Sequence, residues 1–257
     1  MTRKYPTQVE INGKTYKYEK ILKDDFFSVN VLYRHTDADR YVLKLSDFRF
    51  IFGKLLRPFA IWMSSHEYRI YQMVKDLDGV PELGPRLGWR GYFHEYIEGK
   101  TLHELGISNR NALPDSFFDE LKYLIRQLHQ RRIYYVDLNK RGNIILGDDG
   151  KPWLIDYQIC QHFKPRRGWL GRLGDRIFNR LIQEDIYHIY KHKKKFQPHL
   201  ITEQELILAR RSKLAKRYDK YWGRPYRRIK RKIYPSGSNE IIWYKWNKMR
   251  DQTKRTS

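Results

Sequence analysis

The sequence contains little cysteine and no long apolar run, and each absence excludes a class of protein. Cys160 is the only cysteine among 257 residues, which excludes an internal disulfide framework and fits a reducing compartment. No stretch approaches the roughly 18 consecutive apolar residues that a membrane-spanning helix needs. The first residues lead directly into an alternating polar segment and lack the apolar core of a secretory signal. We therefore expect a cytoplasmic protein.

Acidic residues are scarce in the last third of the chain. Residues 163–257 contain 27 Lys and Arg against 8 Asp and Glu, a net charge of +19, whereas residues 1–162 have a net charge of +4. Such a surface attracts an anionic partner: nucleic acid, an anionic membrane face or a phosphorylated substrate. The hydrophobic content of 40% supports a core and argues against global disorder, and the length allows one large domain or two lobes.

Three polar side chains surround a predicted hairpin in the middle of the chain. Asp149-Gly150 is a tight-turn signal between two short apolar runs. With the turn near Asp149, we expect Asn143 opposite Asp156, with Cα atoms roughly 4.5–5.5 Å apart. An amide oxygen and a carboxylate suit Mg²⁺, with phosphate oxygens completing the shell. Asp137, six residues before Asn143, is a candidate proton acceptor. Simple turn formation is the alternative explanation for these residues.

A lysine and a glutamate upstream complete the set of charged candidates. Lys44 lies among apolar residues in the strand predicted for residues 41–45. Glu67 follows 23 residues later, in the helical pattern of residues 66–74, and the Arg57-Pro58 pair suggests a break before it. Taken singly, the alternatives are an edge-strand lysine with its head in water and a solvated helix glutamate.

Further strands and a helix are predicted before and after residues 97–99, where we place the boundary between the two parts of the chain. The Asn12-Gly13 pair predicts a hairpin near the N-terminus, and residues 83–89 and 91–97 read as two strands. A helix with one wide apolar stripe is expected to open at Pro114-Asp115 and to end near residue 130.

Residues 169–182 have the pattern of a basic amphipathic helix. Seven apolar side chains recur across this stretch, and Arg172, Arg176 and Arg180 follow one another at four-residue steps. Such a helix suits peripheral contact with an anionic membrane, which here would be the inner face of the cytoplasmic membrane. The alternative is a helix packed on the core with its arginines in solvent. A further charged helix is expected over residues 202–222.

The order of these features resembles the protein-kinase-like superfamily at its atypical bacterial edge, the RIO-type kinases and the lipopolysaccharide-core (Kdo/heptose) kinases. The likeness covers about residues 9–190, over which a strand lysine, a helix glutamate, a catalytic-loop acid and a metal-binding pair follow one another in the family's order. It implies an α+β, two-lobed protein-kinase-like fold. Residues 1–97 would form a small β-rich N-lobe, and residues 98–257 a mainly helical C-lobe, with a cleft between them.

The resemblance implies a role for each charged candidate. Lys44 would contact the α- and β-phosphates of ATP, and Glu67 would orient Lys44. Asp137 would position and deprotonate the acceptor hydroxyl. Asn143 and Asp156 would bind Mg²⁺.

The nucleotide-binding segments of the family are matched less fully. The resemblance implies that backbone groups of Glu95, Tyr96 and Ile97 receive the adenine. The glycine-rich loop that covers the phosphates is missing, because residues 23–30 contain no glycine. Ser28 and backbone amides remain as the groups that could cover the phosphates.

The catalytic stretch also departs from the family pattern. Tyr135 stands where a histidine is usual, and Asp137 precedes Asn143 by six residues where five is typical. The Asp-Phe-Gly motif is replaced by Asp156-Tyr157-Gln158, and no Ala-Pro-Glu follows. These departures argue against a regulated eukaryotic-type protein kinase.

These features predict an ATP- and Mg²⁺-dependent kinase that transfers the γ-phosphate to a hydroxyl group of a lipopolysaccharide-core sugar or of a protein Ser/Thr. Its expected partners are ATP and an anionic acceptor (a lipid-linked sugar, a protein or an RNA-associated molecule), and the chain is expected to act as a monomer. Two alternatives stay open. A catalytically degenerate pseudokinase scaffold fits the missing glycines, and a nucleic-acid-binding protein fits the basic C-terminal third.

Overall fold

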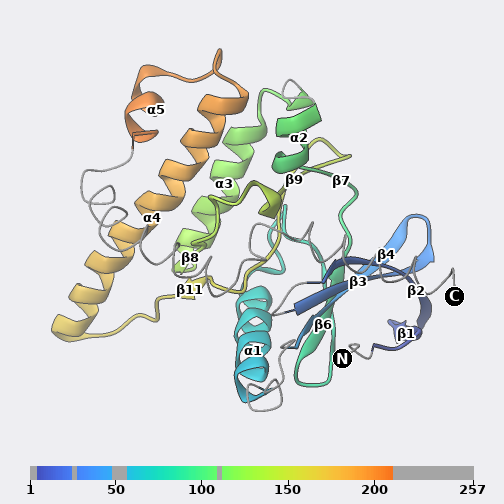
Figure 1. Cartoon of the computed structure of the whole chain (residues 1–257). Coiled ribbons are helices and arrows are strands. Elements are labelled where there is room, and N and C mark those ends of the chain that lie inside the picture. Colours follow the sequence, from blue (N-terminus) through green and yellow to red (C-terminus); the bar gives the residue numbers. More distant parts are fainter. Residues whose placement is uncertain (1–4, 25–27, 48–56, 109–111, 211–257) are drawn as a thin grey trace, which may run out of the picture. The chain divides into compact units, whose positions relative to one another are not determined.

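Within residues 5–24, 28–47, 57–108 and 112–210, which the computed structural model describes, the N-terminal part of the chain forms a six-stranded antiparallel sheet (Figure 1). Its strand order is β1-β2-β3-β4-β6-β5. The strands are β1 (Gln8–Ile11), β2 (Lys14–Asp24), β3 (Ser28–Thr36), β4 (Asp39–Ser46), β5 (Leu83–Leu87) and β6 (Gly91–Glu95). The predicted hairpin at Asn12-Gly13 is confirmed, because both residues have a positive φ, 52° and 75°, and Ile11 pairs with Lys14.

Helix α1 (Arg57–Val74) packs against β4 and β6 of this sheet. The Arg57-Pro58 pair, where a break before the helix was predicted, forms the first residues of α1. Proline is well accommodated in a first turn, where backbone N–H groups have no helical partner. The buried stripe of α1 includes Glu67, so the helical prediction is confirmed and the glutamate faces inward. Residues 48–56, which precede α1, lie outside the described residues.

Helices and short strands follow the sheet. They are β7 (Gly99–Thr101), α2 (Leu102–Ser108), α3 (Phe117–Gln130), β8 (Ile133–Tyr134), the 3-10 turn η2 (Arg141–Asn143), β9 (Ile144–Gly147), β10 (Pro152–Leu154), β11 (Gln161–His162), α4 (Gly168–Phe196) and α5 (Glu203–Leu208). The apolar stripe of α3 lies in the larger hydrophobic core, as its pattern predicts. Helix α4 packs along α3 (Figure 1). The chain therefore has an α+β architecture in which a sheet precedes a mainly helical part.

The predicted hairpin of the catalytic stretch is formed by β9 and β10, but its register differs by one residue from the prediction. Leu154 pairs with Ile144, and the amide of Ile155 donates to the carbonyl of Asn143 at 3.1 Å. Ile155, and not Asp156, is therefore opposite Asn143. The reason lies in the loop between Gly147 and Lys151, whose geometry sets the register of a hairpin.

The described residues up to Ala209 belong to one compact unit. The charged helix predicted over residues 202–222 begins as α5, with a capping box at Thr202 and Glu205, and its remainder lies outside the described residues. Among the helices of the described residues, none combines the length and the apolar character that a bilayer crossing requires.

Candidate active site

The structure brings Lys44 of β4 together with two of the predicted acids. The ammonium of Lys44 donates to Oε1 of Glu67 at 2.6 Å and to Oδ1 of Asp156 at 2.8 Å. Lys44 is 6% exposed and Glu67 is 1% exposed, so this is a buried cluster and not a surface ion pair. The contact with Glu67 excludes the two alternatives, a solvated lysine head and a solvated glutamate.

The charges of this cluster shift the protonation of all three groups. Burial raises the pKa of Asp156, but the charge and hydrogen bond of Lys44 outweigh burial and lower that pKa to about 2. Burial lowers the pKa of Lys44, but Asp156 and Glu67 outweigh it, so the pKa is raised and the amine stays protonated. Burial raises the pKa of Glu67, and the attraction of Lys44 opposes that shift. When all three groups are ionised, two carboxylates share one ammonium.

Asp137 and Asn143 lie in a tight loop that leads into β9. The amide of Lys140 donates to the carbonyl of Asp137 at 3.0 Å, and the amide of Asn143 donates to the carbonyl of Lys140 at 3.1 Å. The side-chain amide of Asn143 lies 3.5 Å from the carbonyl oxygen of Asp137. Since the carbonyl of Asn143 also binds the amide of Ile155, one loop connects the backbones of all three predicted residues, Asp137, Asn143 and Asp156.

Lys140 is a site residue that the sequence reasoning missed. Its ammonium lies 2.5 Å from Oδ2 of Asp137, while 62% of the lysine side chain is exposed. A basic residue three positions after a candidate catalytic acid is the signal that could have indicated it. Lys140 would meet a phosphate that approached Asp137.

The backbone is strained beside both acids. Val136 has a φ of 72° and Asp156 a φ of 68°, and these are two of the four non-glycine residues with positive φ in the described part of the chain. This conformation is a genuine outlier for a β-branched residue such as Val136. Strain of this kind costs about 1–3 kcal/mol and persists where the surrounding structure enforces it, often at functional sites.

A buried column of tyrosine rings connects the loop of residues 135–143 to α1. The rings of Tyr135 and Tyr157 lie 5.6 Å apart, and those of Tyr157 and Tyr71 lie 5.0 Å apart. Tyr135 also donates its hydroxyl to the carbonyl of Ile155. Tyr157 donates to the carbonyl of Leu154 at 3.1 Å. The residues on both sides of Asp156 are thus anchored by packed aromatic side chains.

Asp185 of α4 binds the start of the same loop, and the sequence reasoning missed this residue as well. It is fully buried, and its Oδ2 accepts from the amide of Tyr135 at 3.0 Å and lies 3.0 Å from Nε2 of His129. Burial raises the pKa of Asp185, against the hydrogen bond with His129. The sequence signal was its place on the buried stripe of the helix, between Phe178 and Ile189 at helical spacing.

His192 lies two helical turns after Asp185 on the same face of α4, and it contacts the same loop. Its burial predicts a dependence of stability on pH. Its Nε2 lies 2.9 Å from the carbonyl of Leu138. Burial lowers the pKa of His192 from 6.5 to about 4. Because the folded chain favours the neutral ring, the unfolded chain binds the extra proton between pH 6.5 and 4. The contribution of His192 to stability is therefore present above pH 6.5 and is lost as the pH falls to about 4.

We expect His192→Gln, which keeps a donor near the Leu138 carbonyl, to reduce the loss of unfolding free energy between pH 7 and pH 4.5 by about 2–3 kcal/mol. Urea unfolding of both proteins at the two pH values measures this difference. Equal losses in the two proteins would contradict the assignment of the titration to His192.

The segment after β6 has its backbone groups only partly used. The amide of Glu95 donates to the carbonyl of Glu82 at 2.9 Å, and that of Tyr96 to the carbonyl of Arg40 at 3.0 Å. The amide of Ile97 donates to no backbone carbonyl of the described residues. Of the three positions predicted to receive adenine, Ile97 is therefore the one with an open donor.

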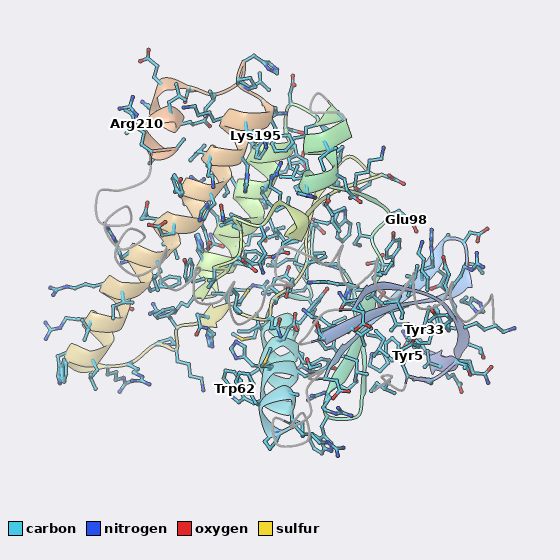
Figure 2. The ribbon with its side chains drawn as sticks, in the orientation of Figure 1. Tyr5, Tyr33, Trp62, Glu98, Lys195 and Arg210 are labelled. Atoms are coloured by element: carbon cyan, nitrogen blue, oxygen red, sulfur yellow. The ribbon has the colours of Figure 1, made fainter. Side chains whose placement is uncertain are left out.

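The neighbouring Glu98 lies where the chain passes from the sheet to the helical part (Figure 2), and it pairs with the guanidinium of Arg40. Its carbonyl accepts from the amide of Asp148 in the β9–β10 turn at 3.0 Å. Ser28, the candidate for covering phosphates, is buried at the start of β3. Residues 25–27 before it lie outside the described residues.

The donor set fits a hard divalent cation only if other oxygens complete it. Within the described residues, no group of three or more His, Cys, Asp and Glu side chains is placed to bind a metal ion. Lys44 uses Oδ1 of Asp156, and Oδ2 accepts no hydrogen bond from the described residues. One carboxylate oxygen and the Asn143 amide oxygen are the ligand types that Mg²⁺ takes, with phosphate oxygens and water in the remaining positions.

Comparison with protein-family models and with curated protein sequences returned no match to this chain. What the site does is therefore inferred from its own geometry and chemistry.

Proposed function

We propose that the chain is an ATP- and Mg²⁺-dependent phosphotransferase of the protein-kinase-like type. The observation on which this depends is the buried Lys44 ammonium bonded at once to Glu67 on α1 and to Asp156 after β10. A lysine shared by these two acids, next to a loop that presents Asp137 and Asn143, is the arrangement that phosphoryl transfer requires of a kinase.

The proposal includes the fold. The six-stranded sheet with α1 would be the N-lobe, and the helical part from residue 98 onward the C-lobe, joined at residues 97–99. Two hydrogen-bonded connections would join the two lobes: Lys44 to Asp156, and Arg131 of the helical part to the carbonyl of Met73 on α1.

Each residue then has a defined task. Lys44, oriented by Glu67, would bind phosphate oxygens of ATP as a point charge. Asp137 would accept the proton of the acceptor hydroxyl while the hydroxyl oxygen forms the new bond to the γ-phosphorus. The bond from the γ-phosphorus to the bridging oxygen breaks, and ADP leaves with that oxygen. Asn143 and Asp156 would bind Mg²⁺, which supplies neutralisation of phosphate charge when bound. Positioning and charge stabilisation would supply most of the rate enhancement.

A pseudokinase scaffold is the second candidate, and the absence of glycine from residues 23–30 favours it. Without close backbone contact to the phosphates, nucleotide affinity would be lower. The intact set of Lys44, Glu67 and Asp156 favours catalysis, because a buried and a partly buried carboxylate around one buried ammonium are costly to keep unless they serve a purpose.

The acceptor is expected to be anionic because of the basic C-terminal third. A transfer screen tests both the activity and the acceptor: γ-labelled ATP and Mg²⁺ are incubated with the full chain and separate lipid, sugar, RNA and protein fractions. We expect label in one fraction with the wild type and none with Asp156→Asn. Absence of label in all fractions, together with no ADP formation, would contradict the proposal.

A further inference from the structure

The first half of α4 presents large apolar side chains to solvent. Trp169 is 67% exposed, and three aliphatic residues on the same helix, Leu170, Leu173 and Ile177, are 47%, 46% and 45% exposed. Single exposed apolar residues need no explanation, but four on one short stretch do. In Figure 1 these first turns, drawn in yellow, extend past the end of α3.

These four side chains form one stripe, because residues three and four apart are neighbours on a helix surface. Trp169, Leu173 and Ile177 follow at four-residue steps, with Leu170 beside them. The buried positions of the same turns, Gly171 and Phe178, lie on another face. At Gly171 a Cβ atom would overlap the carbonyl of Arg166, so the preceding loop covers that side of the helix. The fold thus covers one face of α4 and leaves the apolar stripe uncovered by the described residues.

Positive charge flanks the stripe. Residues 163–183 contain six basic side chains and one acidic side chain, Asp175, which lies 2.5 Å from the guanidinium of Arg132. Arg172, Arg176 and Arg180 are exposed, and each immediately precedes an apolar residue in the sequence. The arginines therefore follow one edge of the apolar stripe. Among the described residues none of the three has an ion-pair partner. The surface therefore complements an anionic occupant.

We propose that residues 169–180 of α4, the α4 stripe, dock in the plane of an anionic lipid bilayer. The apolar side chains would enter the boundary between headgroups and acyl chains, and the three arginines would contact headgroup phosphates. A nucleic acid would satisfy the charge but would give the aliphatic side chains no apolar layer to enter. The combination of both features favours the bilayer. The proposal involves no residue of the candidate active site and stands independently of phosphotransfer.

Sedimentation with sucrose-loaded vesicles tests the inference on the full chain. Vesicles of phosphatidylcholine alone are compared with vesicles in which one third of the lipid is phosphatidylglycerol. We expect the wild type to bind the anionic vesicles at least about tenfold more strongly, and to lose this preference at high salt. Replacing Leu170, Leu173 and Ile177 together by Gln should weaken binding on the order of 100-fold.

The charge has its own matched pair of variants. Replacing Arg172, Arg176 and Arg180 by Gln should weaken binding to the anionic vesicles on the order of 100-fold, from about fivefold per arginine. The control replaces three exposed lysines on other elements, Lys17, Lys75 and Lys151, by Gln, which lowers the net charge equally and should change binding less than about threefold.

A second control replaces exposed apolar residues elsewhere, Trp89, Ile107 and Ile207, by Gln, and should bind as the wild type does. Asp137→Asn should also bind vesicles normally, which separates this result from any loss of catalysis. The proposal is overturned if the wild type stays in the supernatant, with or without tight binding of an RNA oligonucleotide. It is equally overturned if the stripe variants and their controls bind vesicles alike.

Discussion

Asp137→Asn should lower the rate of phosphate transfer by about 10²–10⁴-fold, the usual contribution of a positioned general base. Asparagine keeps the size of the side chain and cannot accept the proton of the acceptor hydroxyl. Since Asp137 shares no side-chain contact with Lys44 or Asp156, nucleotide binding should remain within about threefold of the wild type. Initial rates of ADP formation and of label transfer measure the effect.

Asp148→Asn is the matched control for this experiment. Asp148 is an exposed acid in the turn of the β9–β10 hairpin, and its amide, which the substitution retains, is the group that binds Glu98. The control should keep the wild-type rate. Full activity in Asp137→Asn would remove Asp137 from the mechanism.

Lys44→Met should lower the free energy of unfolding by about 3–5 kcal/mol, the range for breaking a buried ion pair from one side. The substitution leaves the buried Glu67 and the partly buried Asp156 without their common cation. Adding Glu67→Gln in the same chain should recover part of the loss, because it removes one of the two unpaired charges. Urea unfolding at pH 7 measures the three proteins.

Lys14→Met provides the comparison at the surface. Lys14 lies 2.7 Å from Asp39, but its side chain is 55% exposed, so losing this pair should cost less than about 1 kcal/mol. Similar losses for Lys44→Met and Lys14→Met would contradict the description of Lys44 as the centre of a buried cluster.

Local sequence patterns predicted the individual elements well. An Asn12-Gly13 pair between alternating segments strongly favours a tight hairpin turn. The apolar residues of α3 lie on one face of the helix, so that face is the one expected to be buried. The approach of Lys44 to Glu67 was expected from the resemblance to kinases, since the strand and helix patterns alone left a solvated lysine and a solvated glutamate open. These features depend on residues close in sequence, or on periodicity, and a single chain displays both.

Features set by contacts between distant residues were harder to predict. The register of β9 and β10 depends on how many residues the turn from Gly147 to Lys151 takes up, and one residue moves the partner of Asn143. The support from Asp185 on α4 to the amide of Tyr135 spans 50 residues and could not be seen locally. The positive φ of Val136 contradicts the preference of valine and reflects its surroundings.

Helix α4 contributes both to the candidate active site and to the proposed membrane-docking surface. Its middle supports the catalytic loop through Asp185 and His192, whereas its first turns present the α4 stripe. If both proposals hold, docking on a bilayer would place the candidate site close to a lipid surface, where a lipid-linked acceptor would be met. Vesicle binding and phosphate transfer can nevertheless be measured separately.

The most direct test of the central claim is calorimetric binding of a non-hydrolysable ATP analogue to the full chain, with and without Mg²⁺. We predict saturable binding of one nucleotide per chain that weakens at least about tenfold when Mg²⁺ is withheld. Asp156→Asn should show the same weakness even with Mg²⁺ present, while Asp148→Asn should bind as the wild type does. No binding under any condition, or binding that neither Mg²⁺ nor Asp156→Asn changes, would contradict the account and would favour a scaffold.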